Sequence, residues 1–358
     1  MNILHILPSL NLYGGTPRIV KDLVTQSKHM HYIYCRSSWE GKDKYEEFRV
    51  EFIKSNINLF DGLYGKNIVK HIYEMLKIID KNSIEIIHCY FDYCIVLGGI
   101  IRCLRPQIKL IVTFQGSSSP SGYLTISLLA LAYRKVDKFI YISKYVKESK
   151  YQVFAGLKNK EEQIIYNGAN KYKSHTTKLS NQQIISTISG LNKYKNLPVL
   201  IDCMNIIVNE KKRNIILNII GDGDEKANIE NRIKIYNLES HINLLGYRSN
   251  VSDYLNESLL CVHPADQEGF GIAVVEAMLM KKPVILSNAG ALPELIADNE
   301  SGILADPYNP YDWAEKIMKL LDDKNLRDRV AIKGYERASK LFSIQRYVNE
   351  LDKVYSGI

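Results

Sequence analysis

The sequence lacks any apolar run long enough to cross a membrane. Its longest candidate, Cys94–Leu104, is interrupted by Arg102 and is shorter than the about 18 apolar residues that a membrane-spanning helix needs. The first ten residues have neither a basic region ahead of their apolar run nor a small-residue cleavage site, so they predict a first strand and not a signal peptide. We therefore expect a cytoplasmic protein.

Paired cysteines, internal repeats and low-complexity tracts are also missing. The six cysteines form no C-x-x-C motif and lie within apolar segments, which predicts buried free thiols in a reducing compartment and argues against a disulfide framework or a cysteine-based metal site. The hydrophobic (46%) and charged (24%) contents are those of ordinary globular proteins. A chain of 358 residues is long enough for two domains.

The excess of positive charge belongs to the first half of the chain. Residues 1–172 contain 24 lysines and arginines against 15 acidic residues, whereas residues 173–358 contain 23 against 24. This asymmetry predicts an anionic partner: a membrane surface, a phosphorylated lipid or nucleic acid. The alternative is that lysine-rich helix faces only keep the protein in solution. Because no basic motif interleaved with aromatic residues and no zinc module is present, we expect no nucleic-acid partner.

Short runs rich in isoleucine, valine, leucine and tyrosine alternate with longer helical patterns. Such alternation predicts parallel, doubly wound sheets covered by helices on both faces. The expected strands are Asn2–Leu10, His31–Ser37, Ile84–Tyr90, Leu110–Gln115, Phe139–Ser143, Gln163–Asn167, Ile184–Ile188, Ile215–Ile220, Ile242–Gly246, Leu259–His263, Pro283–Ser287 and Gly302–Leu304. The expected helices include Arg18–Ser27, Ile68–Lys81, Tyr123–Lys135, Leu197–Asn209, Gly271–Met280 and Ile344–Tyr355.

A polar stretch, Gly168–Gln183, separates two such series and predicts an interdomain linker. We therefore expect an α/β protein with an N-terminal domain at 1–172 and a C-terminal domain at 173–340. The helical segment 341–358 is expected to cross back to the first domain. Two such domains, with their strand ends facing a central cleft, would form a natural ligand site.

The strongest local motif runs from Glu268 through Gly269 and Gly271 to Glu276. It follows an apolar run that predicts a buried strand, and it precedes a predicted helix. The glycines allow the backbone to approach a ligand, and the start of the helix offers free N–H groups to phosphate oxygens. One carboxylate could then contact a sugar while the other holds ribose hydroxyls. The alternative is that Glu268 caps the helix and Glu276 lies on its surface.

This motif is one of several that resemble the retaining glycosyltransferases of family 4, which have the GT-B fold. The family's glutamate pair matches Glu268–Met278, and its downstream proline and glycine pattern matches Lys282–Pro307. The family's Asn-Gly pair, aspartate-containing strand and Gly-Gly loop match Asn167–Gly168, Val136–Val146 and Tyr13–Arg18. The resemblance covers nearly the whole chain and implies two doubly wound, Rossmann-like domains facing a central cleft.

The resemblance also implies roles for individual residues. The donor's sugar hydroxyls would contact Glu268, its diphosphate would be neutralised by Lys195, and its ribose would be bound by Glu276. A cation at Lys195 makes chemical sense because negative charge develops on the diphosphate as it leaves; the alternative is a solvated lysine. The other donor-binding candidates are Gly14, Gly15, Gly223, Tyr247, Arg248, Gly269, Phe270, Gly271 and Ile272.

Two positions depart from the family's pattern. Gly190 stands where the family has an arginine, so Lys193 or Arg18 would assist Lys195. Gln115 stands where many members carry a histidine; its amide cannot act as a base, but it can orient a hydroxyl of the acceptor. The leaving phosphate would then deprotonate the acceptor. The catalytic candidates are Glu268, Lys195 and Gln115, and the acceptor-binding candidates are Gln115 and Arg18.

Several smaller signals have ordinary explanations. The segment Asp222–Asp224 resembles the D-x-D metal motif, but its place after a strand predicts a turn. His88 and His263 lie at strand ends without ligand-spaced partners, which predicts core or cleft-lining residues. We expect no metal and no cofactor. The apolar segment Tyr123–Lys135 is either a membrane-interface helix or a helix packed on the sheet.

Together these observations predict a retaining, metal-independent glycosyltransferase that moves a sugar from a UDP- or GDP-sugar to a glycan. The basic half favours a lipid-linked acceptor, as in surface polysaccharide or lipopolysaccharide assembly, and a peripheral position on the inner face of the cytoplasmic membrane. A catalytically inactive GT-B binding or scaffold subunit is one alternative, favoured by Gly190 and Gln115. A GT-B nucleotide-sugar epimerase is another, and it fits the glutamate pair less well.

Overall fold

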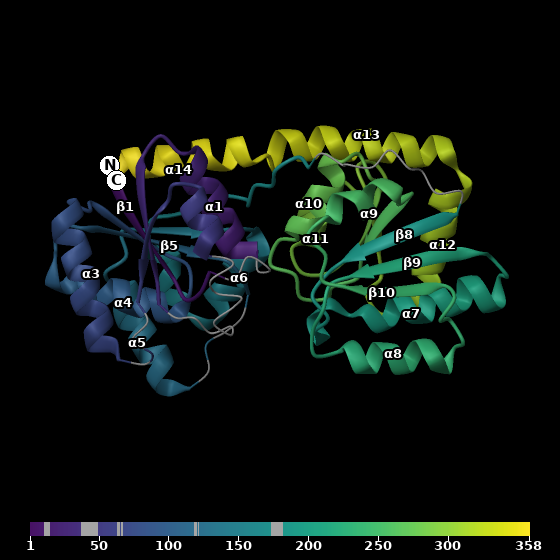
Figure 1. Ribbon diagram of the computed structural model, residues 1–358, viewed down its shortest axis with the longest axis horizontal. Coiled ribbons are helices and arrows are strands. Elements are labelled where there is room, and N and C mark those ends of the chain that lie inside the picture. The colour runs from purple at the N-terminus through teal and green to yellow at the C-terminus, as the bar shows by residue number, and fades with distance from the viewer. Residues whose placement is uncertain are drawn as a thin grey trace. The chain divides into compact units, whose positions relative to one another are not determined.

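The computed structural model describes residues 1–10, 15–36, 49–62, 65, 67–117, 120, 122–172 and 182–358. The chain divides into two compact units (Figure 1): unit 1 comprises Met1–Gly168 together with Ile344–Ile358, and unit 2 comprises Ala169–Ser343. Most of the linker expected at Gly168–Gln183 lies at residues 173–181, outside the described residues.

Unit 1 contains a parallel sheet of seven strands in the order β3-β2-β1-β4-β5-β6-β7. Its central strands are almost completely buried, as the continuous apolar runs predicted. The strand β3 was not predicted, because it is a short, half-exposed edge strand with polar residues at both ends. The strands are β1 (Asn2–Leu7), β2 (Met30–Cys35), β3 (Asn58–Asp61), β4 (Ile86–Cys89), β5 (Lys109–Phe114), β6 (Lys138–Tyr141) and β7 (Glu162–Ile164).

The helices of unit 1 include one from the far end of the chain, α14. Its carboxylate Asp352 accepts hydrogen bonds from Ser27 Oγ at 2.5 Å and from the backbone N of Lys28 at 3.2 Å. Arg346 donates to the backbone carbonyls of Tyr166 and Asn167, so α14 is fixed to unit 1 in its first turn and beyond its middle. The helices are α1 (Gly15–Gln26), α3 (Ile68–Asn82), α4 (Asp92–Leu104), α5 (Tyr123–Tyr133), α6 (Lys144–Val153) and α14 (Ile344–Gly357).

A buried chain of polar side chains joins α14 to the middle of this sheet. His5 on β1 lies 2.8 Å from His31 on β2 and 2.8 Å from Tyr90 Oη. His88 on β4 lies 2.7 Å from Tyr355 Oη on α14. Burial lowers the pKa of all three histidines, to about 4 for His31 and about 3 for His88. His88 is therefore a neutral core residue.

Unit 2 contains a parallel sheet of six strands in the order β10-β9-β8-β11-β12-β13. This is the same winding as in unit 1, because each sheet grows first to one side of its first strand and then to the other. The strands are β8 (Gln183–Ile188), β9 (Ile215–Ile220), β10 (Ile242–Gly246), β11 (Leu260–His263), β12 (Val284–Ser287) and β13 (Ile303–Ala305). The helices are α7 (Leu197–Asn205), α8 (Lys226–Ile235), α9 (Val251–Glu257), α10 (Ile272–Leu279), α11 (Leu292–Leu295), α12 (Pro310–Asp322) and α13 (Lys324–Leu341).

Both units are thus doubly wound, Rossmann-like sheets, as predicted. In such sheets ligands bind at the carboxyl ends of the strands, next to the point where the winding reverses. That point lies beside β1 and β4 in unit 1 and beside β8 and β11 in unit 2.

One expectation about the cysteines is wrong. Cys103 is exposed, because it lies near the end of α4 on the side away from the sheet, whereas the other five are buried. No helix among the described residues has the length and apolarity to span a membrane.

Candidate active site

The loops that follow β8 and β9 lie directly against each other. The backbone N of Ser189 donates to Ile220 at 3.0 Å, and that of Leu191 donates to Asp222 at 3.0 Å. Gly221 has a φ of 145°, and a Cβ there would lie 1.9 Å from the carbonyl oxygen of Ser189. Only glycine fits such a close approach. The segment Asp222–Asp224 is therefore a tight turn, and no group of three metal-ligating side chains occurs in the described part of the chain.

Lys195 and Glu268 come together at the carboxyl ends of β8 and β11. Lys195 ends a short 3-10 turn after β8, and its Nζ donates to Glu268 Oε2 at 2.5 Å. His263, the last residue of β11, places its Nε2 3.0 Å from the same carboxylate oxygen. All three side chains are mostly shielded from solvent. Two predicted catalytic residues thus form one cluster, and His263 joins them.

The electrostatics of this cluster set the protonation states of Glu268 and His263. Burial alone would raise the pKa of Glu268, but the hydrogen bond from His263 and the charge of Lys195 hold it well below its usual value. Burial and the nearby ammonium of Lys195 lower the pKa of His263. At neutral pH, Glu268 is therefore ionised and His263 is neutral. Because an ionised carboxylate only accepts hydrogen bonds, the proton of His263 is on Nε2.

The loop after β12 holds the backbone of Glu268 in place. The N–H of Ala291 donates to the carbonyl of Glu268 at 2.9 Å. Gly290 has a φ of 59°, and a Cβ at this position would lie 2.7 Å from both the backbone N and O of Glu268. A glycine is needed there for its conformation and for the space. The family match over Lys282–Pro307 includes this glycine but did not indicate its contact with Glu268.

The alternative that Glu268 caps a helix is wrong. Helix α10 begins at Ile272 with Gly271 in the capping position, and no side chain caps it. Gly269 precedes Phe270, whose side chain is buried against Phe342 at a ring distance of 5.6 Å. Only backbone groups at Phe270, Gly271 and Ile272 can therefore serve a ligand at this end of α10.

Glu276 is not a surface residue either. It lies in the second turn of α10, is buried, and accepts a hydrogen bond from Tyr172 Oη at 3.2 Å. Its buried carboxylate needs polar partners, because an unpaired charge is costly away from water. Tyr172, at the junction between the two units' sequences, was not singled out by the motif.

The remaining unit 2 candidates lie on loops at the same edge of the sheet. Gly246 ends β10 and accepts a hydrogen bond from the N–H of Gly221 at 2.9 Å. Tyr247 follows it and is exposed, and Arg248 Nε donates to Tyr254 Oη at 3.2 Å. Gly223 lies in the β9 loop, beside Leu191.

There is free space at Gly190, where the family has an arginine. Gly190 is exposed, and a Cβ there would lie 3.6 Å from its nearest neighbour, Asn192 Nδ2. Lys193 is exposed and begins the same short 3-10 turn that Lys195 ends. A longer side chain at 190 would fit without displacing the backbone.

In unit 1, the predicted acceptor residue Gln115 follows β5 and pairs with an asparagine. Asn167 Nδ2 donates to Gln115 Oε1 at 3.1 Å. The other two polar atoms, Gln115 Nε2 and Asn167 Oδ1, are buried without a partner among the described residues. Gly15 and Arg18 lie in the first turn of α1. Gly14, and Tyr13 before it, lie outside the described residues.

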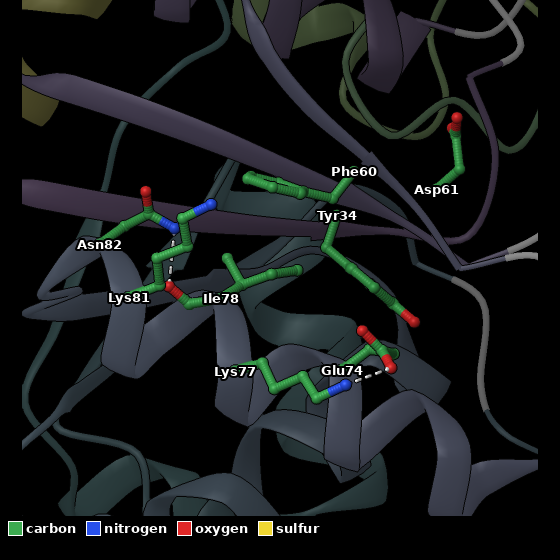
Figure 2. A pocket seen from close by; sticks show the side chains of 8 residues that line it. All are labelled: Tyr34, Phe60, Asp61, Glu74, Lys77, Ile78, Lys81 and Asn82. Atoms are coloured by element: carbon green, nitrogen blue, oxygen red, sulfur yellow. Dashed lines mark hydrogen bonds and ion pairs between the residues drawn. The ribbon is translucent and has the colours of Figure 1, made fainter.

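A separate hollow of 230 Å³ lies beside the edge strand β3 of unit 1. Figure 2 shows Tyr34 and Phe60 on its strand side and Lys77 and Glu74 on its α3 side. The ammonium of Lys77 donates to Glu74 at 3.2 Å, so these charges satisfy each other. None of the candidate residues lines this hollow.

Comparison with known proteins identifies related sequences over nearly the whole chain. Residues 13–171 match the family model described as Glycosyltransferase Family 4, and residues 169–337 match the one described as Glycosyl transferases group 1. The chain is 31% identical over 352 residues to an uncharacterized glycosyltransferase, MJ1178, of Methanocaldococcus jannaschii, which covers 96% of this chain and 95% of that protein.

The chain is also similar to a second curated protein in sequence and to a crystal structure in fold. The chain is 26% identical over 319 residues to a poly(ribitol-phosphate) alpha-N-acetylglucosaminyltransferase of Staphylococcus aureus, covering 84% of this chain and 64% of that one. Its fold matches the crystal structure of Anabaena Alr3699/HepE in complex with UDP-glucose with a TM-score of 0.85 and 19% identity over the full length of both chains.

Proposed function

The chain belongs to the glycosyltransferases of family 4, which have the GT-B fold, and we propose that it transfers a sugar from a UDP- or GDP-sugar to a glycan with retention of anomeric configuration. The observation that carries this proposal is the cluster of Lys195, Glu268 and His263 at the carboxyl edge of the unit 2 sheet. The relatives support the activity and the fold; the donor and the stereochemistry are part of the proposal.

The cluster has the charges that a nucleotide-sugar donor requires. The ammonium of Lys195 would bind the diphosphate and stabilise the charge that develops when it leaves. The ionised carboxylate of Glu268 would accept hydrogen bonds from the sugar's hydroxyls. The neutral His263 would hold this carboxylate in its orientation. Since Lys195 supplies positive charge at the leaving group, we propose that the reaction needs no metal.

The nucleoside part of the donor would extend along the neighbouring loops. We propose that Glu276 binds the ribose and that Tyr247 and Arg248 lie near the base. The diphosphate would lie beside the tight turn at Gly223. The backbone at Gly269, Phe270, Gly271 and Ile272 would hold the sugar and phosphates, because the uncapped start of α10 favours anionic oxygens.

The acceptor would be oriented by the amide pair of Gln115 and Asn167. One hydroxyl can accept from Gln115 Nε2 and donate to Asn167 Oδ1, the two buried atoms that have no partner among the described side chains. A buried amide without partners is costly, so a substrate hydroxyl at this place is favourable. Because an amide takes no proton, Gln115 positions the hydroxyl and does not deprotonate it.

The chemical step then uses the leaving group as the base. The acceptor oxygen forms a bond to the anomeric carbon while the bond from that carbon to the phosphate oxygen breaks. The acceptor's proton passes to the departing phosphate. Lys195 lowers the barrier by stabilising the diphosphate, which is the usual main contribution of a fixed cation in such a site.

The acceptor is proposed to be a lipid-linked or surface glycan at an anionic membrane. The S. aureus relative named for poly(ribitol-phosphate) supports an anionic polymer as acceptor, and the net positive charge of residues 1–172 is consistent with it. A peripheral position on the inner membrane face belongs to the same proposal.

A catalytically inactive binding subunit is the second candidate. The open position at Gly190 favours it, because the cation that the family places there is missing.

A panel of UDP-, GDP-, ADP- and TDP-sugars distinguishes the two. Binding to the folded state raises apparent stability by about 2.7 kcal/mol at a hundredfold excess over Kd. We expect one UDP- or GDP-sugar to raise the melting temperature and to be slowly hydrolysed to the nucleoside diphosphate. A donor that binds without any release would support the binding subunit, and the absence of binding by all four would contradict the proposed donor site.

A further inference from the structure

Helix α5 has no charged side although it lies at the surface, and Thr125 and Ser127 are its only exposed polar residues besides the tyrosine Tyr123. Its sequence, YLTISLLALAY over Tyr123–Tyr133, has no charged residue. A helix at the surface of a water-soluble protein normally has a polar face opposite its buried one, and a helix that is apolar all round is normally enclosed by protein or lipid. Figure 1 shows α5 at the lower margin of unit 1, beside α4.

One side of α5 is packed against its own unit. Leu129, Ala132 and Tyr133 are buried, and a Cβ at Gly99 of α4 would lie 2.8 Å from Ala132 Cβ. The helix backbones therefore approach closely through small residues. Helix α5 is thus packed mainly on α4, and its last residue, Tyr133, reaches the sheet at Phe114 of β5. The expected helix is present, but most of its buried side faces α4 and not the sheet.

The opposite side of α5 is uncovered by the described residues. Tyr123 is 94% exposed, Leu124 74%, Leu128 41% and Leu131 56%. The three leucines are spaced at i, i+4 and i+7, so they form one stripe along the helix. We call this stripe, together with Tyr123, the α5 face.

The chain that forms α5 and its flanks is basic up to Asp137, which pairs with Arg102. No acidic residue occurs between Asp92 and Asp137 in the sequence. Arg134 and Lys135 follow α5 directly, are exposed, and have no ion-pair partner among the described residues. Lys160 extends to the same place, where its Nζ lies 3.5 Å from the carbonyl of Arg134.

We propose that the α5 face inserts into the interfacial region of an anionic lipid bilayer, with Arg134 and Lys135 contacting the headgroups. An apolar stripe beside unpaired cations is the combination that binds anionic membranes, since apolar burial and attraction to anionic lipids add. The inference deepens the proposed function by assigning the residues that would hold the protein at its acceptor's membrane. Gln115 lies in the segment that connects β5 to α5, so the proposed acceptor residue and the α5 face belong to adjacent parts of the chain.

Vesicle flotation with the full-length chain tests this inference. The vesicles contain either phosphatidylcholine alone or phosphatidylcholine with one-third phosphatidylglycerol. The variant Leu124→Gln/Leu128→Gln should bind the anionic vesicles at least about tenfold more weakly, equivalent to about 1.4 kcal/mol. The control variant Ile235→Gln removes a leucine-sized side chain that is 65% exposed on α8 of unit 2, and it should bind like the original chain.

A second pair of changes tests the charge. Arg134→Gln/Lys135→Gln should weaken binding at low salt, and its difference from the original chain should shrink as salt screens the attraction. All variants should keep the melting temperature and the response to the donor sugar, because the altered side chains are exposed and lie outside the donor site.

Three results would overturn the inference. The first is no binding of the original chain to anionic vesicles, and the second is equal binding by the leucine variant. The third is a concentration-dependent dimer that the leucine variant abolishes while no vesicle binding is seen, which would identify a second copy of the chain as the occupant. A donor response retained in any of these cases would leave the proposed activity standing.

Discussion

Acidification from pH 7.5 to pH 5 should loosen unit 1 more than unit 2, because of the three buried histidines. In the folded protein, burial lowers the pKa of His31 to about 4 and that of His88 to about 3, and it lowers the pKa of His5 as well. In the unfolded chain the value is about 6.5. Below pH 6.5 the unfolded state therefore binds protons that the folded state does not.

The sign and size of the effect follow from this difference. Stability contributed by a neutral buried histidine is present above pH 6.5 and is lost as the pH falls toward the folded pKa. At pH 5, protons bind to each of these histidines in the unfolded chain but hardly at all in the folded protein. This difference lowers the free energy of unfolding by about 2 kcal/mol for each histidine. His31 and His88 together contribute about 4 kcal/mol, a large part of the 5–15 kcal/mol that is typical of a folded domain.

Hydrogen exchange measured by mass spectrometry can follow each unit separately. After correction for the intrinsic exchange rate, amides of β1 and β4 should lose protection between pH 7.5 and pH 5 by far more than amides of β8 and β9. A variant His31→Gln carries one fewer titrating group, so its loss should be smaller. Equal losses in the two units would refute the view that these histidines are buried and neutral.

Two further predictions concern the proposed site. Glu268→Gln should lower transfer at least about a hundredfold while tightening the binding of the free nucleoside diphosphate, because Lys195 loses its competing carboxylate; unchanged transfer, followed by release of the diphosphate, would contradict the assignment. Gln115→Leu should lower kcat/KM for the acceptor by up to about tenfold, the worth of one hydrogen bond, with donor hydrolysis unchanged, and an effect on donor hydrolysis of the same size would argue against an acceptor role.

Much of the fold could be predicted because buried parallel strands have a distinct composition. The runs Ile215–Ile220 and Ile242–Gly246 are β9 and β10 as the structure has them. The strand β3 could not be found in this way, since its half-exposed residues have no apolar run. Helix α4 was noticed only as an apolar run too short to cross a membrane, because burial on both sides leaves it without a polar face.

The candidate site could be predicted where a motif carries it. Lys195 and Glu268 were matched to a pattern, and the structure places them in contact. His263 was considered a core or cleft residue, because a single histidine at a strand end has no spacing that reveals its partner. The pairing of Gln115 with Asn167 joins residues far apart in the chain. The fold brings them together because the segments that follow β5 and β7 lie on either side of the strand β6.

The return of α14 to unit 1 has a consequence for how the protein is made. Unit 2 is one continuous segment, Ala169–Ser343, whereas unit 1 needs residues on both sides of it. On a ribosome, the second sheet can therefore finish folding while the first still lacks its last helix. The hydrogen bond between His88 and the hydroxyl of Tyr355 can form only after Tyr355, 267 residues downstream, has been synthesised. N-terminal domains usually fold first during synthesis. Here the N-terminal unit is the one that can be completed last.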